Sequence, residues 1–390
     1  MENCLSKLQI DKEKIEKYAD IVSKSAFYLA LFIELTIVIL DKSDYIIQYE
    51  SLWFRLTFLL CGLSLMTTKH SIREWIALVV FAMIGTAVYF ISGENELLRY
   101  VIFVWACVGK DMKKVMKHTF WYTTAGCLVL FLLSVTGIYG RVFVQQVYRV
   151  DAVGGSGIEE IRYCFGMGHP NAFHCMMLVI TWLGVYCYHE KLKWHHYLIM
   201  LAAHLVCFYY TDSRTGLLMS VGSLAMFAGV QFIKPLQNNK WIYIFAIMLV
   251  VGAVGFSVFA AKYSINHPLL AKVDNILSNR IFQLMETDYD MGMLHSWRLF
   301  SPERTRFFFD MGIVRFFYWY GIIPGIAYFG AQLRMIWCGY KKKDYMLAVI
   351  VAVIAIYSVF EGHFTSVYLG RNYILFFFGM YLTDMLGGKQ

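Results

Sequence analysis

The stretch WIYIFAIMLVVGAVGFSVFA, residues 241–260, runs for twenty residues without a charged side chain. A helix of that length matches the hydrocarbon core of a bilayer, which is about 30 Å thick. The whole chain of 390 residues has the same character, because 59% of its residues are apolar, 16% are charged and its mean hydropathy is +0.54. This composition predicts a polytopic membrane protein with one membrane domain over residues 1–390.

Twelve apolar runs predict about twelve transmembrane helices. Two runs, 51–66 and 97–109, are short or contain an arginine, so ten or eleven spans remain alternatives. The runs lack the alternation of a β-barrel strand, which leaves an all-α fold. The expected spans are residues 25–40, 51–66, 75–92, 97–109, 119–138, 169–188, 197–211, 215–233, 241–260, 313–334, 345–361 and 369–386.

The lysines indicate how these helices are oriented. Eighteen of the 21 lysines lie in the terminal segments and in the even-numbered connections between spans. Short cytoplasmic loops collect positive charge, so both termini are expected in the cytoplasm. Residues 1–24 are too charged for a cleavable signal peptide and are predicted to form an amphipathic helix on the cytoplasmic membrane surface.

The arginines follow a different pattern. Ten of the 14 fall on or near the opposite, outer face. A planar guanidinium fits phosphate and carboxylate oxygens, so this pattern indicates an anionic outer partner. Ion pairs with outer acids or lipid phosphates are the alternative. The ten are Arg141, Arg149, Arg162, Arg214, Arg280, Arg298, Arg304, Arg306, Arg315 and Arg371.

The long connections also lie on the predicted outer face. Residues 139–168 form one outer loop and residues 261–312 a larger one, and loops of this length are usually functional. The first contains VGGSG at 153–157, which we interpret as a flexible turn because it lacks the lysine of a phosphate-binding loop. The second contains KVDNILSNRIFQLM, whose apolar spacing predicts an interfacial helix with Arg280 on its polar side.

The junction CFYYTDSRTGLLMS, residues 207–220, places an arginine beside an aspartate where two apolar runs meet. We expect Asp212 to orient Arg214, with Ser213 and Thr215 available as hydrogen-bond donors. The amides that open the next helix favour an anion at the same place. The alternative is an Asp212–Arg214 pair that only neutralises a helix end.

Metal chemistry is not expected. The nine cysteines are scattered without a CxxC pair, and the eleven histidines include no HExxH motif. We therefore predict no metal site, no cofactor and no outer disulfide.

Four short motifs follow one another along the chain, namely GMGHPNAF (166–173), DSRTG (212–216), LSNRIFQ (277–283) and FDMGIVRFFYWYGIIPG (309–325). Their order and spacing resemble those of the Wzy-type polysaccharide polymerases, relatives of the O-antigen ligases. The resemblance covers roughly residues 160–330. It implies a metal-independent glycosyltransferase of the C type, a multi-pass protein of the bacterial cytoplasmic membrane.

The resemblance also implies substrates and partners. Such an enzyme polymerises oligosaccharide repeat units carried on polyprenyl (undecaprenyl) pyrophosphate, at the outer face of the membrane, towards O-antigen, capsule or exopolysaccharide. Donor and acceptor are both lipid-linked, membrane lipids surround the protein, and a chain-length regulator is a further expected partner; nucleic acid is not. In that family one arginine at the SRTG-like junction and one in the large loop engage the pyrophosphate, which carries over to Arg214 and Arg280.

The acceptor hydroxyl needs a general base. The ligases are expected to have a histidine just before the span that begins near residue 313, and this chain has Asp310 there. Asp310 is therefore the first candidate for the base, and its alternative role is to cap the following helix. His295 in the same loop is the second candidate. Glu361 and His363, at the outer end of the penultimate span, are the third.

Further substrate contacts are expected nearby. His169 and Asn171 open a span after the first outer loop, where capping the helix is the alternative role. Arg162 and Arg298 are two more arginines of the outer loops that we expect to bind substrate.

Two other classes remain as alternatives. An O-antigen ligase would differ only in its acceptor. A transporter or flippase of an anionic lipid-linked substrate would be expected to show related halves, span-breaking residues near the midplane or interior arginines. Four of the five prolines instead lie at span edges or in loops, and Arg55 and Arg99 are too few interior arginines to favour a flippase.

Overall fold

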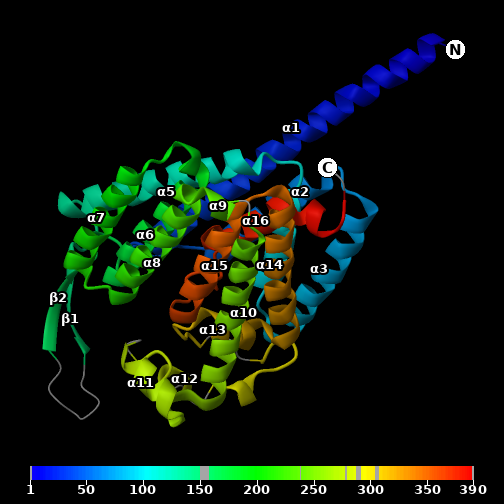
Figure 1. Ribbon diagram of the computed structural model, residues 1–390. Helices are drawn as coiled ribbons and strands as arrows, with labels where there is room; N and C mark the ends of the chain where they lie inside the picture. Colours follow the sequence, from blue (N-terminus) through cyan, green and yellow to red (C-terminus); the bar gives the residue numbers. More distant parts are fainter. Residues whose placement is uncertain are drawn as a thin grey trace.

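The computed structural model of the chain describes residues 2–149, 158–237, 239–276, 279–286, 291–303 and 307–388. This described part is mostly helical (Figure 1). Six of its helices are long and apolar enough to cross a membrane, and two further apolar helices are shorter. The structure thus agrees with a multi-pass α-helical membrane protein, while the number of twelve spans stays a prediction.

A helix overlaps every predicted span. These helices are α1 (Glu2–Asp41), α2 (Glu50–Met66), α3 (Ile72–Ser92), α4 (Glu96–Ala106), α5 (Met112–Val135), α6 (Pro170–Tyr188), α7 (Trp194–Thr211), α8 (Arg214–Phe232), α10 (Lys240–Tyr263), α14 (Ile322–Lys342), α15 (Tyr345–Phe360) and α16 (Tyr373–Met385). The 11 residues of α4 extend roughly 16 Å, about half of a bilayer core, so α4 does not cross it alone.

Shorter elements connect these helices. They are α9 (Lys234–Gln237), α11 (Pro268–Ile276), α12 (Gln283–Glu286), α13 (Gly312–Tyr320) and the 3₁₀ turns η1 (His189–Lys191), η2 (Ser264–Asn266), η4 (Leu294–Ser296) and η5 (Leu369–Arg371). In Figure 1, α11, α12 and α13 lie at the same end of the bundle as the two strands.

Helix α15 forms the centre of the molecule. Its sequence is apolar around the whole helix, and all but three of its 16 residues are buried. A helix without a polar face must be enclosed by others, and α15 packs against α6, α8, α10, α13 and α14. Asp344 starts α15 by accepting a hydrogen bond from the amide of Leu347 at 2.9 Å.

The predicted span 313–334 is not one helix. It breaks at Gly321, whose φ of +99° is unfavourable for other residues and whose absent side chain leaves room for the backbone of Phe300. The amides of Ile322 and Ile323, which open α14, donate to the carbonyls of Arg298 and Leu299 at 2.9 Å. The prediction missed this break because it depends on a segment from elsewhere in the chain.

The mostly helical fold agrees with the all-α prediction, and it also contains a β-hairpin that the sequence analysis did not predict. Strand β1 (Phe143–Arg149) pairs antiparallel with β2 (Ile158–Tyr163) inside the predicted outer loop 139–168. The hairpin projects from the body beside α7 (Figure 1). The VGGSG segment at 153–157 lies outside the described residues.

Helix α1 is continuous from the amphipathic segment 1–24 into the first predicted span. It extends beyond the rest of the molecule as a single long helix (Figure 1). Ile15 and Tyr18, two apolar residues of this segment, are exposed. The location of this segment on the cytoplasmic membrane surface stays a prediction.

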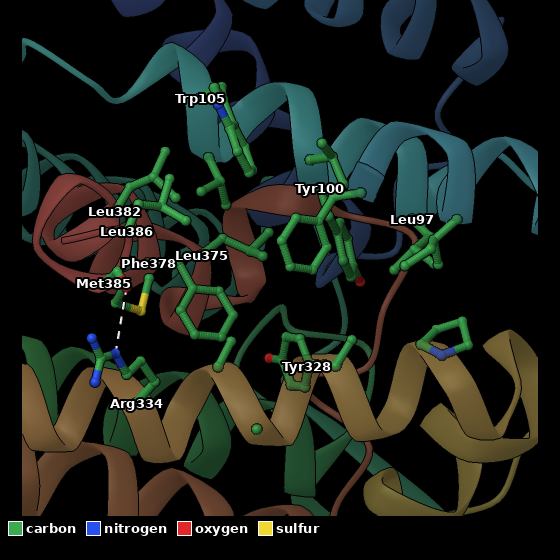
Figure 2. A pocket seen from close by; sticks show the side chains of 18 residues that line it. Leu97, Tyr100, Trp105, Tyr328, Arg334, Leu375, Phe378, Leu382, Met385 and Leu386 are labelled. Atoms are coloured by element: carbon green, nitrogen blue, oxygen red, sulfur yellow. Dashed lines mark hydrogen bonds between the residues drawn. The ribbon is translucent and has the colours of Figure 1, made fainter. Parts of the chain in front are cut away.

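An apolar cavity of about 340 Å³ lies between α3, α4, α14 and α16 (Figure 2). Tyr100 and Phe378 face Tyr328 across it, and Arg334 at one end donates a hydrogen bond to the carbonyl of Met385 at 3.4 Å. Apart from Arg334, its described lining carries no charged side chain. Such a lining suits hydrocarbon rather than a charged ligand.

Candidate active site

The candidate site is a polar cavity of about 600 Å³, here called the cationic cavity. Six separate stretches of the chain line it, from the end of α1 to the residues before α16. Its charged lining residues are Lys42, Arg162, Arg214, Arg280, Arg315, Arg371, Asp212, Asp310 and Glu361. Among the described residues, six cationic side chains face three carboxylates, a formal excess of three positive charges.

The α7–α8 junction supplies one wall. Asp212 has left-handed backbone angles (φ 46°, ψ 34°) that end α7, and Ser213 follows as the N-cap residue of α8. Thr215 also lines the cavity. A side chain on Gly216 would come within 2.6 Å of the His174 ring, so glycine lets α8 start close against α6. The junction therefore directs the first amides of α8 towards the cavity.

Arg214 is exposed at the first position of α8. Among the described residues, its guanidinium makes no hydrogen bond or ion pair, and no pair joins it to Asp212. The expectation that Asp212 orients Arg214 is therefore wrong, and so is the alternative of a neutralising pair. Asp212 contributes the turn through its backbone, which leaves Arg214 available to a ligand.

Arg280 lies on a tight turn between α11 and α12, and the predicted continuous interfacial helix is wrong. The carboxylate of Asp274 accepts hydrogen bonds from the amides of Ile281 at 2.6 Å and Phe282 at 3.2 Å, and Asn279 is left-handed (φ 62°). These contacts reverse the chain where the apolar spacing predicted a helix. The turn buries Arg280 to 4% exposure at the cavity wall.

Two carboxylates hold Arg280. Its Nη2 donates to Glu361 Oε1 at 2.5 Å, its Nε lies 3.4 Å from Asp310 Oδ2, and its Nη1 donates to Thr215 Oγ1 at 3.1 Å. Burial by itself would lower the pKa of Arg280, but Glu361 and Asp310 outweigh it and the pKa is raised. Arg280 is thus a fixed cation that links the large loop to the α7–α8 junction.

The carboxylates differ in exposure. The Asp310 side chain is 49% exposed, whereas that of Glu361 is 20% exposed. Burial raises the pKa of Glu361, although Arg280 opposes the shift. The N-cap of α13 is Met311, so the proposed capping role of Asp310 is wrong, and its carboxylate lines the cavity beside Arg280.

His169 and Asn171 both line the cavity and both have structural contacts. His169 Nδ1 accepts a hydrogen bond from the amide of Asn171 at 3.1 Å and so caps α6. Arg162 on β2 donates to Asn171 Oδ1 at 3.1 Å and to the carbonyl of Thr211 at 2.6 Å. The helix-entry role is confirmed, and it leaves these residues at the cavity wall.

Three basic residues of the cavity were not among the predicted site residues. Arg315 on α13 donates to the carbonyl of Gly362, and its guanidinium carbon lies 5.1 Å from the Trp319 ring centroid. Arg371 pairs with Asp41 at the end of α1. Arg315 and Arg371 are among the ten arginines on or near the predicted outer face, so the sequence already indicated them as candidates for anion binding.

Lys42 is the third of these residues. It follows the end of α1, and burial lowers its pKa. Lys42 is also one of the three lysines that lie outside the terminal segments and the even-numbered connections, so the sequence already marked its position as unusual. His363 lines the same wall, and burial, followed by Lys42 and Arg315, lowers its pKa well below the usual range.

Two predicted site residues lie elsewhere. His295 is exposed on η4, and Arg298 is exposed two residues beyond that turn and donates to the carbonyl of His295 at 3.2 Å. Neither lines the cationic cavity. The structure therefore brings together Arg214, Arg280, Asp310, Asp212, Ser213, Thr215, His169, Asn171 and Arg162, and leaves these two apart.

The cavity is suited to a multiply charged anion that carries a polar group. Its volume is in the range of small-molecule sites, and its guanidinium groups supply fixed positive charge without rearrangement. The described residues include no group of three or more potential metal ligands among His, Cys, Asp and Glu. No family model, curated protein or solved structure matches the chain.

Proposed function

We propose that this protein is a membrane glycosyltransferase that polymerises oligosaccharide repeat units carried on polyprenyl pyrophosphate, at the outer face of the bacterial cytoplasmic membrane. One observation supports this most directly: Arg214 and Arg280, from motifs about 65 residues apart, line one cavity with three carboxylates and an excess of positive charge among its described residues. A diphosphate leaving group fits that charge, and a carboxylate beside it fits a base.

The proposed reaction is a displacement at the anomeric carbon of the donor. The acceptor hydroxyl oxygen forms the new glycosidic bond, the bond from the anomeric carbon to the diphosphate oxygen breaks, and the hydroxyl proton passes to a carboxylate. Asp310 is the favoured base because it is the more exposed carboxylate and is held less closely by Arg280. The arginines stabilise the negative charge that develops on the departing diphosphate.

The proposal is tested first by removing the two arginines of the motifs. We expect Arg214→Ala and Arg280→Ala each to lower polymer formation about 100-fold or more, because each removes charge stabilisation from the transition state. The purified chain in nanodiscs is supplied with lipid-linked repeat units, and the product ladder is quantified. Calorimetry with inorganic pyrophosphate measures the affinity of the anion site independently of polymer formation. We expect each variant to bind pyrophosphate at least tenfold more weakly than the wild type.

Arg73→Ala is the matched control, because Arg73 is an exposed arginine that lines neither the cationic nor the apolar cavity. It should retain full polymer formation and pyrophosphate affinity. If Arg214→Ala and Arg280→Ala both behave like this control, the assignment of the cationic cavity to a diphosphate is wrong. Transfer to a different acceptor with intact pyrophosphate binding would favour the ligase alternative.

A further inference from the structure

The apolar cavity between α3, α4, α14 and α16 lies where helix packing leaves a gap. Helix α16 packs against both α4 and α14, and side chains of α4 and α14 face each other across the cavity (Figure 2). An apolar gap loses the dispersion contacts that a close-packed interior makes. A hydrocarbon ligand would restore these contacts.

The polar side-chain atoms of the lining already have partners in other parts of the protein. The hydroxyls of Tyr100 and Tyr328 and the indole N–H of Trp105 each donate a hydrogen bond to a group outside the lining. Arg334, at one end, is the exception among the described lining residues. A lining without spare donors or acceptors suits a hydrocarbon chain and is unsuited to a sugar.

The length of the cavity matches one leaflet of a bilayer. Its lining extends on α14 from Pro324 to Arg334, and along α16 from Leu375 to Leu386. At about 1.5 Å per residue, each stretch is about 15 Å long. This is half of a hydrocarbon core that is about 30 Å thick. An acyl chain that starts beside Arg334 therefore reaches the bilayer midplane within the cavity.

Gly330 opens the cavity to the membrane. It lies between the two ends of the lining on α14 and is exposed, and a side chain at this position would have no other atom within 4 Å of its Cβ. Glycine is a poor helix former, so its place inside α14 does not stabilise the helix. What it provides is open space, through which a lipid chain can enter from the side.

Arg334 supplies a cation at the mouth of the cavity. It is exposed, and its one hydrogen bond among the described residues runs from Nε to the carbonyl of Met385. Asp384, the neighbouring acid on α16, pairs instead with Lys342 at 2.6 Å. The guanidinium is therefore available to a phosphate. The lysine distribution predicts that this end of α14 faces the cytoplasmic leaflet, where basic pockets between helices bind anionic headgroups.

We propose that the apolar cavity binds one acyl chain of an anionic membrane phospholipid, with the lipid phosphate at Arg334. The chain fills the space between α4 and α14, and the phosphate pairs with the guanidinium. One lipid is then a fixed part of the fold, whereas the lipids around the rest of the protein exchange freely. The site is independent of the proposed function, because neither Gly330 nor Arg334 lines the cationic cavity.

The test uses the purified full chain, stripped of lipid in detergent and titrated with phosphatidylglycerol or phosphatidylcholine. Native mass spectrometry counts the lipids that stay bound. We expect one phosphatidylglycerol to bind about tenfold more tightly than phosphatidylcholine, because no choline balances its negative charge. Phosphatidylglycerol with a photoreactive acyl chain should crosslink to the lining residues of α14 and α16, which peptide mapping identifies.

Two variants separate the chain from the phosphate. Gly330→Leu fills the cavity without a clash and favours the helix. It should weaken the binding of both lipids at least tenfold, abolish the crosslink, and melt no lower than the lipid-free wild type. Arg334→Ala should still bind a chain, with phosphatidylglycerol affinity reduced about tenfold to the phosphatidylcholine value.

Gly252→Leu is the matched control. Gly252 is an exposed glycine inside α10, a side chain there would also have no other atom within 4 Å of its Cβ, and it lines neither the apolar nor the cationic cavity. This variant should bind and crosslink phosphatidylglycerol like the wild type.

Three results would overturn the proposal. The first is a wild type that retains no lipid, and the second is Gly330→Leu binding phosphatidylglycerol as tightly as the wild type does. The third is a wild type that binds both phospholipids equally, since Arg334 would then not select the headgroup. Displacement of phosphatidylglycerol by a lower concentration of polyprenyl phosphate would also overturn it, because the cavity would then belong to the lipid carrier.

Discussion

Arg214 and Arg280 have different environments although both come from the predicted motifs. Arg280 is buried and held by Glu361, Asp310 and Thr215, whereas Arg214 is exposed and has no described partner. A guanidinium that is paired with carboxylates keeps its position when a ligand binds. An unpaired guanidinium can move towards the ligand and pair with it. We infer that Arg280 organises the site and that Arg214 provides the uncompensated charge.

The two carboxylates should be separable by their pH dependence. Burial raises the pKa of Glu361, so its ion pair with Arg280 should fail as the pH falls through a value above the ordinary glutamate range, and activity should fall with it. We expect the Glu361→Gln variant to have reduced activity, and we expect this activity to stay nearly constant as the pH falls. We expect Asp310→Asn to lose about 100-fold at every pH, because the base is absent.

Initial rates between about pH 4 and pH 9 measure both effects. Asp310→Asn keeps a side chain of nearly the same size and shape, so lost activity would report the missing proton acceptor. Full activity of Asp310→Asn would transfer the base role to Glu361. If the activity of Glu361→Gln falls at low pH in the same way as that of the wild type, the loss of activity at low pH does not come from the ion pair between Glu361 and Arg280.

At the scale of elements, the turn between α11 and α12 determines whether Arg280 reaches the cavity. Asp274 stabilises it by accepting two backbone amide hydrogen bonds, and Ser264 Oγ donates to the carbonyl of Ile281 at 2.9 Å. Ile281 and Leu284 are fully buried beneath the turn. The same apolar residues that suggested an interfacial helix therefore anchor a turn.

Asp274 lies outside the cationic cavity, so its replacement tests this positioning role. Asp274→Ala leaves two amides without their acceptor, at a cost of about 1–3 kcal/mol each where they are buried. We expect activity and pyrophosphate affinity to fall at least tenfold while protein is still made. Asp274→Asn keeps one acceptor oxygen and should recover part of the loss.

Lys272→Ala is the control for this prediction, because Lys272 is exposed on the same helix. It should not change pyrophosphate affinity or activity. Pyrophosphate affinity that survives Asp274→Ala at the wild-type value would show that the turn does not position Arg280.

At the scale of the whole molecule, segments that are distant in sequence meet at one end of the bundle. Lys42, Arg162, Arg214, Arg280 and Arg371 span most of the chain, and all of them line one cavity. Each belongs to a connection that the lysine distribution places outside, or to the edge of one. Their meeting agrees with that orientation, although the orientation itself stays a prediction.

Accessibility labelling tests the orientation. In a background without the nine native cysteines, Phe308→Cys and Arg214→Cys should react with a membrane-impermeant maleimide in intact spheroplasts. Lys343→Cys should react only after permeabilisation, because it lies in a predicted cytoplasmic connection. All three positions are exposed. Labelling of Phe308→Cys and Arg214→Cys from opposite sides would exclude a shared cavity and with it the proposed reaction.

The sequence by itself determined the membrane helices and the best arginine candidates. Helix formation in an apolar run is local, because the length of the run need only match the bilayer and its backbone hydrogen bonds are internal. The contrast between lysines and arginines marked ten outer arginines, and the resemblance of the short motifs selected Arg214 and Arg280 among them. Both signals are local, because each depends only on the residues of one short segment. Both arginines line the cavity.

Only the tertiary structure decided which residues share the site. It added Lys42, Arg315 and Arg371, left out His295 and Arg298, and replaced the expected interfacial helix by a turn. It also split the span 313–334 at Gly321, where the chain accommodates Phe300. These features depend on packing between segments far apart in the chain, and hydrophobic spacing within one segment carries no information about its distant neighbours.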